Sequence, residues 1–107
     1  MAFNQGDRVR PSKGGFLMTV EWDRGGTVTC WYFDAADNLL KEQINAPDLV
    51  LVGTFGQAPN LQIGGGARLR SGGPLMSVQD LDEAFATCKR AKDITEQYPI
   101  NMLMEAS

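Results

Sequence analysis

The two cysteines, Cys30 and Cys88, are the side chains best suited to covalent chemistry, because a thiolate is a strong nucleophile. The 107-residue sequence contains no histidine, so neither thiol has the usual activating base and the commonest zinc ligand is absent. Both cysteines lie among β-prone, apolar residues, which is typical of buried small hydrophobes. A disulfide between them is the alternative. No carboxylates are paired for acid–base catalysis either. From these absences we predict no enzyme activity, no metal site and no cofactor.

Aromatic side chains gather in the first half of the chain, at Trp22 and in the run Trp31-Tyr32-Phe33. Alternate residues of a strand face opposite sides, so Trp31 and Phe33 should lie opposite Tyr32. Only one face of a small barrel is core, and exposed aromatic rings are common anchors at interfaces. Trp22, Trp31 and Phe33 are therefore candidate partner-binding residues. The alternative is that all these rings pack inside the protein or between its two halves.

Two arginine pairs, Arg8 with Arg10 and Arg68 with Arg70, are each spaced two residues apart, so each pair should project from one face of a strand. Guanidinium groups bind carboxylate and phosphate, and beside stacking rings they suit a groove for single-stranded nucleic acid. A solvated outer face that discourages edge pairing is the more ordinary interpretation. We retain Arg8 and Arg10 as candidate binding residues.

The charge balance favours a protein partner over nucleic acid. The net charge is −3, with 5 basic and 7 acidic residues in 1–53 and 5 and 6 in 54–107, whereas a nucleic-acid footprint normally shows a basic surplus. The N-terminal residues lack the apolar segment of a signal peptide, and the longest aliphatic run, Leu49–Val52, is far too short to span a membrane. We expect a cytoplasmic protein without membrane contact.

An internal repeat organises the chain. Residues 14–20 (GGFLMTV) match residues 72–78 (GGPLMSV) at an offset of 58 (72 − 14), and Thr29-Cys30 matches Thr87-Cys88 at the same offset. Beyond the cysteines the offset falls to 54, which a shorter hairpin loop in the second copy explains. We predict two tandem copies joined by a Gly- and Pro-containing connector. Their bounds are 1–53 for copy one, 54–60 for the connector and 61–107 for a degenerate copy two.

Each copy should be a small, strongly bent β-barrel, since short β-prone segments alternate with turns at about ten-residue spacing. In copy one, Met18, Val20 and Trp22 are expected on one face of their strand. Val28, Cys30 and Tyr32 should share one face of the next. The expected strands are residues 8–10, 17–22, 27–33, approximately 39–44, and 49–52.

Residues 80–92 allow two interpretations. Leu81, Ala84, Phe85, Cys88 and Ala91 have the spacing of an amphipathic helix. The competing interpretation makes Asp82-Glu83 a hairpin turn that leads into a strand over residues 85–90. The repeat favours the strand, because Cys88 should then occupy the place that Cys30 has in copy one.

Several segments together are similar to a known family. They are GDxV at residues 6–9, SKGGxLMTV at 12–20, VxCWYFD at 28–34 and KE at 41–42, with RSGGPLMSV at 70–78 and EQYP at 96–99 in the second copy. This combination covers most of the chain and resembles the YodC-like family of short uncharacterised bacterial proteins. The resemblance implies a small SH3-like barrel in each copy and no assigned activity. Copy two departs from the pattern where Lys89-Arg90-Ala91 replaces the aromatic run.

The sequence thus predicts an all-β protein of two tandem SH3-like barrels packed together, with a short helix in copy two as the alternative. We expect a non-catalytic interaction module that binds a protein partner, or another copy of itself, through Trp22, Trp31, Phe33, Arg8 and Arg10 and through strand edges. The first alternative is a small β-barrel that binds nucleic acid. The second is a small inhibitor of a host factor, encoded by a phage or another mobile element.

Overall fold

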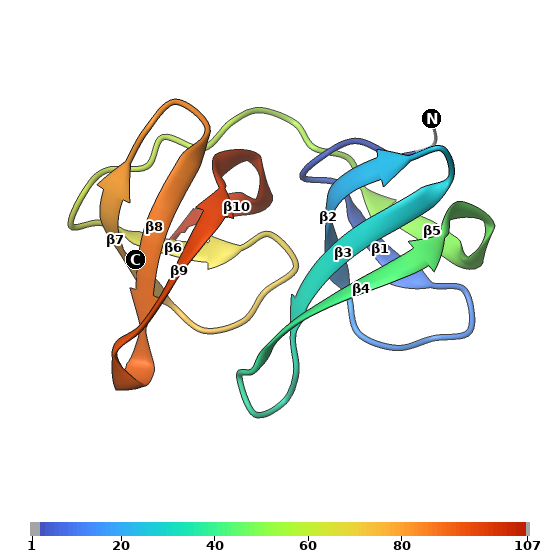
Figure 1. Ribbon diagram of the computed structural model, residues 1–107, viewed down its shortest axis with the longest axis horizontal. Helices are drawn as coiled ribbons and strands as arrows, with labels where there is room; N and C mark the ends of the chain where they lie inside the picture. The colour runs from blue at the N-terminus through green and yellow to red at the C-terminus, as the bar shows by residue number, and fades with distance from the viewer. Residues whose placement is uncertain (1–2, 107) are drawn as a thin grey trace.

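A computed structural model describes residues 3–106 and shows an all-β protein with two antiparallel five-stranded sheets side by side (Figure 1). The first sheet has the strand order β4-β3-β2-β1-β5. Its strands are β1 (Arg8–Pro11), β2 (Met18–Arg24), β3 (Thr27–Phe33), β4 (Leu39–Asn45) and β5 (Leu49–Gly53), and a 3₁₀ turn, η1 (Ala46–Asp48), joins the last two.

The second sheet has the order β10-β6-β7-β8-β9, which is the same order read from the other end. Its elements are β6 (Gly66–Leu69), β7 (Met76–Leu81), β8 (Phe85–Arg90), η2 (Ala91–Asp93), β9 (Ile94–Pro99), η3 (Ile100–Met102) and β10 (Leu103–Ala106). We call residues 3–53 the first half and residues 61–106 the second half.

Positions in the two halves correspond by strand register. The residue numbers of equivalent positions differ by 58 up to the end of β3 and β8, and by 54 from β4 and β9 onward. The change is visible in the strand pairs: Trp31 pairs with Lys41 in the first half, and the equivalent Lys89 pairs with Thr95 in the second. Turn hydrogen bonds follow the same correspondence. The Gly6 N–H donates to the Val20 carbonyl at 2.9 Å, and the Gly64 N–H donates to the Val78 carbonyl at 2.8 Å. Equivalent residues therefore have the same backbone environment.

The strand interpretation of residues 85–90 is confirmed. The Asp82 side chain accepts hydrogen bonds from the backbone N–H groups of Ala84 (2.8 Å) and Phe85 (2.7 Å), which closes a turn where a helix would have to continue. The following strand, β8, pairs with β7 and β9 on its two sides. These cross-strand bonds outweigh the helical spacing of the apolar residues.

The expected common face of Met18, Val20 and Trp22 is wrong at Trp22. Val20 pairs with Cys30 but Trp22 pairs with Thr29, so Glu21 is an extra residue in β2 and forms a β-bulge. The bulge turns the Trp22 side chain outward while Met18 and Val20 stay buried. The equivalent irregularity in β7 lies between Val78 and Asp80.

Strand β3 contributes to two cores. Val28, Cys30 and Tyr32 face the first core, together with Val9, Met18 and Val20, as alternation predicted. Trp31 and Phe33, on the opposite face, belong instead to the core of the second half, together with Tyr98, Met102 and Leu103. One strand of the first half thus supplies two rings to the core of the second half.

Polar contacts also join the halves. The Thr19 hydroxyl donates to the Ser71 hydroxyl at 2.8 Å and accepts from the Ser71 N–H at 2.9 Å. The Arg70 Nε donates to the Gly6 carbonyl at 3.0 Å. In the connecting segment, the Phe55 N–H donates to the buried Asp7 carboxylate at 2.7 Å. The two halves therefore form one packed unit.

Candidate functional site

Trp31 and Phe33, two of the expected partner-binding residues, are covered by the protein itself. Their side chains are only 4% and 7% exposed. The Trp31 ring lies 5.7 Å from the Tyr98 ring, and its Nε1 donates to the Glu21 carboxylate at 2.7 Å. The Phe33 ring lies against Gly73 of the second half. This burial corrects the expectation that the two rings are displayed on the surface and agrees with the alternative that they pack between the two halves.

Trp22 is the expected anchor that does reach solvent, with 41% of the residue exposed. Its Nε1 donates to the Thr29 hydroxyl at 3.0 Å, and the Arg24 guanidinium lies 3.8 Å from the ring centroid. Both contacts restrict the orientation of the indole, and the Arg24 guanidinium covers one face of the ring.

The two expected arginines lie in different environments. Arg10 is exposed on β1, whereas Arg8 is half-buried at the junction of the halves, with its side chain against Gly53. The Arg8 Nε is buried and has no hydrogen-bond partner among the described residues. Burial, followed by repulsion from Arg8, lowers the pKa of the neighbouring Arg70. Arg10 is therefore the accessible cation of this pair.

An exposed apolar strand edge lies beside Arg10. Val50, Leu51 and Val52 of β5 are 52%, 45% and 45% exposed, although they are consecutive aliphatic residues. Strand β5 pairs with β1 on one side and ends the sheet on the other, within the part of the chain that the structure describes. Val50 lies directly opposite Arg10. We call Arg10, Val50, Leu51 and Val52 the β5 edge.

Sequence reasoning did not single out the three aliphatic residues of the β5 edge. The available signal was the run Leu49–Val52 itself, because a strand with one solvated face normally alternates apolar and polar residues. A continuous aliphatic run is typical of a strand buried on both faces, yet only Leu49 of the four residues is buried. Whether such a strand is buried or exposed depends on its place in the sheet, and β5 lies at the end. The spacing of apolar residues does not reveal that place.

The cysteines are buried and unpaired, as the favoured interpretation predicted, and the disulfide is not formed. Burial raises the pKa of the Cys30 thiol to about 12 and that of the Cys88 thiol to about 11. At neutral pH both are protonated and shielded, which suits packing. No group of three or more potential metal-ligating side chains occurs among residues 3–106.

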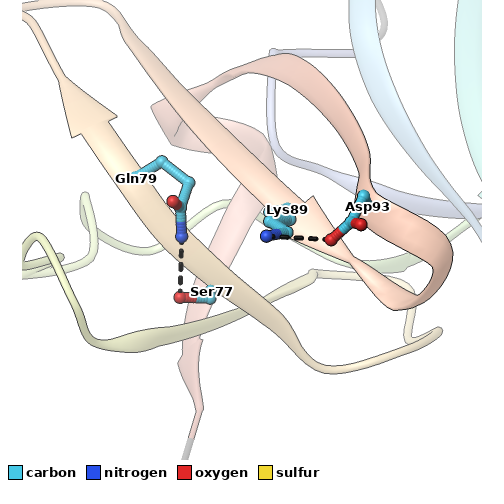
Figure 2. Close-up of polar contacts among 4 residues, drawn as sticks. All are labelled: Ser77, Gln79, Lys89 and Asp93. Carbon is cyan, nitrogen blue, oxygen red and sulfur yellow. Dashed lines mark hydrogen bonds and ion pairs between the residues drawn. The ribbon is translucent and has the colours of Figure 1, made fainter.

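An open pocket of about 510 Å³ lies on the outer face of the second half. The backbone of Gly64–Gly66 forms one wall, and Ser77, Gln79, Lys89 and Ala91 contribute to the rest. Figure 2 shows the polar side chains in this region: the Gln79 amide donates to the Ser77 hydroxyl at 3.0 Å, and Lys89 forms an ion pair with Asp93 at 2.9 Å. The pocket therefore combines polar strand side chains with the apolar Leu75, Met76 and Ala91.

Family models, curated proteins and solved structures give no match to this chain. The resemblance to the YodC-like family therefore stays a prediction based on sequence. No helix among residues 3–106 is long and apolar enough to cross a membrane.

Proposed function

We propose that this chain is a non-catalytic protein-interaction module whose β5 edge binds an extended segment of a protein partner. The observation that carries this proposal is the exposure of Val50, Leu51 and Val52 on a strand that ends its sheet. Long apolar edge strands are normally shielded by charge, by proline or by a covering element, because their free N–H and C=O groups pair with other chains. An unshielded edge is suited to strand addition.

The side chains around the edge indicate the chemistry of the partner. Val50 offers an apolar contact, and the Arg10 guanidinium directly opposite it on β1 offers a cation. A partner strand that alternates apolar and acidic residues would satisfy both groups, with main-chain hydrogen bonds providing affinity and side chains providing selectivity. Nucleic-acid binding has less support, because Trp31 and Phe33 are covered and Arg8 is half-buried.

The proposal includes the architecture. We propose that the chain is a tandem duplication of one SH3-like module with bounds near 1–53 and 61–107, as in the YodC-like pattern. The shared strand order, the β-bulges at equivalent positions and the matching turn hydrogen bonds support a duplication. A duplicated scaffold that keeps an apolar edge in one half provides a single binding strand on a rigid support.

A pair of matched variants tests the function. Val50→Lys places a charge on the β5 edge, and Met104→Lys makes the same change at the equivalent, also exposed position of β10. Purification from the native host should recover one partner with the wild type and with Met104→Lys, and lose it with Val50→Lys. Both variants should keep the wild-type melting temperature. Retention of the partner by Val50→Lys, or no specific partner at all, would contradict the proposal.

A further inference from the structure

The contact between the two halves uses two different surfaces. The first half contributes Gly6, Thr19, Trp31 and Phe33, which we call the receiving face. The second half contributes what we call the inserting face, namely Arg70, Ser71, Gly73, Tyr98 and Asn101. Because the two surfaces differ, the contact is heterologous, and a heterologous contact can repeat from one copy to the next.

The second half has its own receiving face, and it is open to solvent. The residues equivalent to Gly6, Thr19, Trp31 and Phe33 are Gly64, Ser77, Lys89 and Ala91, and all four line the 510 Å³ pocket. Thr19, Trp31 and Phe33 are buried, whereas Ser77 and Ala91 are exposed and Lys89 is half-buried. The pocket is thus the uncovered counterpart of the surface that holds the two halves together.

The first half likewise has an uncovered inserting face. The residues equivalent to Arg70, Ser71 and Gly73 lie in the loop between β1 and β2, which is exposed from Ser12 to Phe16. The equivalents of Tyr98 and Asn101 are the half-buried Ile44 and the exposed Pro47. One receiving face and one inserting face therefore remain open, on different halves of the molecule.

The substitutions at these open faces are complementary. In the internal contact Trp31 packs on Tyr98. At the open faces Lys89 stands in place of Trp31, and Ile44 stands in place of Tyr98. Glu42 lies two residues before Ile44, on the same side of β4. Within the chain the Lys89 ammonium pairs with Asp93, and the Glu42 carboxylate accepts from the Tyr32 hydroxyl. Both groups keep solvent-exposed atoms that can form an additional ion pair between chains. Ala91 replaces Phe33, while Phe16, whose ring stacks on Tyr32 and is 49% exposed, replaces Pro74 in the loop that would face it. The smaller residue leaves room for the larger ring.

Because the contact that joins the two halves within one chain can be repeated between chains, we propose that the pocket of the second half binds the Ser12–Phe16 loop of a second copy of this chain. The Ser77 hydroxyl takes the place of Thr19 and accepts the Lys13 N–H, as Thr19 accepts the Ser71 N–H within the chain. Chains then associate head to tail and form open-ended oligomers. These faces exclude the β5 edge, so the inference does not depend on the proposed function.

Sedimentation velocity over a wide range of protein concentration tests the association. The wild-type mass should rise with concentration beyond that of a dimer, and added salt should reverse the rise because the Lys89–Glu42 pair is screened. Ser77→Lys, a bulky charge in the pocket at an exposed position, should give a monomer. Gln57→Lys, the same change in the exposed connecting segment, and Val50→Lys should associate like the wild type.

A mixing experiment tests the direction of the contact. Asp48→Arg alters the inserting face, at an exposed residue next to Pro47, which is the equivalent of Asn101. Ser77→Lys and Asp48→Arg chains should each be monomeric alone and form a 1:1 dimer, and nothing larger, when mixed. A symmetric contact would give no such rescue and would overturn the proposal.

The double variant Lys89→Trp, Ala91→Phe supplies the remaining control. The two large rings remove the Lys89–Glu42 pair and fill the room that Ala91 leaves for Phe16, so this variant should raise the concentration at which association begins by about tenfold or more. A wild type that stays monomeric at every concentration overturns the proposal, even if the double variant associates. A monomeric wild type would mean that Lys89 and Ala91 prevent self-association. Binding of a different protein at the pocket would likewise contradict the proposal.

Discussion

At the scale of single residues, the two tryptophans show how position decides the role of a side chain. Trp31 is buried between the halves and Trp22 lies on the surface. Trp31→Ala should lower the free energy of unfolding by about 3–5 kcal/mol, because it leaves a large cavity. Trp22→Ala should cost about 1 kcal/mol, since it loses one exposed hydrogen bond and an arginine contact. Urea unfolding followed by circular dichroism measures both values, and equal losses would contradict the assigned positions.

At the scale of elements, the Asp82 turn fixes the start of β8, and its contribution should depend on pH. Hydrogen bonds from the Ala84 and Phe85 N–H groups lower the pKa of Asp82 below its ordinary value of 3.8. A lowered pKa means that the carboxylate stabilises the folded state fully above the unfolded pKa and that this effect is lost as pH falls. Asp82→Ala should therefore reduce the melting temperature at pH 7 and have little effect near pH 2. Glu83→Ala, one residue along the same exposed turn, should change little at either pH.

The elements also show how far sequence reasoning reaches. The expected strands 27–33 and 85–90 agree with β3 and β8, because turn residues and β-branched or aromatic runs are local signals. The bulge at Glu21 was not predicted, since Met18, Val20 and Trp22 alternate equally well without it. The burial of Trp31 and Phe33 against the second half was one of two interpretations that the sequence left open. Periodicity places them opposite Tyr32 but does not show that the second half covers them.

At the scale of the whole molecule, the stability of the two halves should be coupled through Phe33. A Cβ added at Gly73 would overlap the Phe33 ring, whereas a Cβ at Gly72 meets nothing within 4 Å, and both glycines have positive φ. Gly73→Ala should therefore lower the melting temperature clearly more than Gly72→Ala, because both share the backbone strain and only one disturbs the contact. Thermal unfolding of both variants checks this. Equal effects would mean that the halves are not coupled here.

The placement of Trp31 and Phe33 in the core of the second half also determines the order in which the protein is completed during synthesis. The first half can close its own core with residues that lie within one fifty-residue stretch of sequence. Its outward rings are covered by residues of the second half, among them Gly73, Tyr98 and Met102, and Tyr98 follows Trp31 by 67 residues (98 − 31). A growing chain therefore carries an uncovered aromatic surface until residues of the second half are made. Because the contact joins distant parts of the sequence, we expect it to form after the local contacts within the first half.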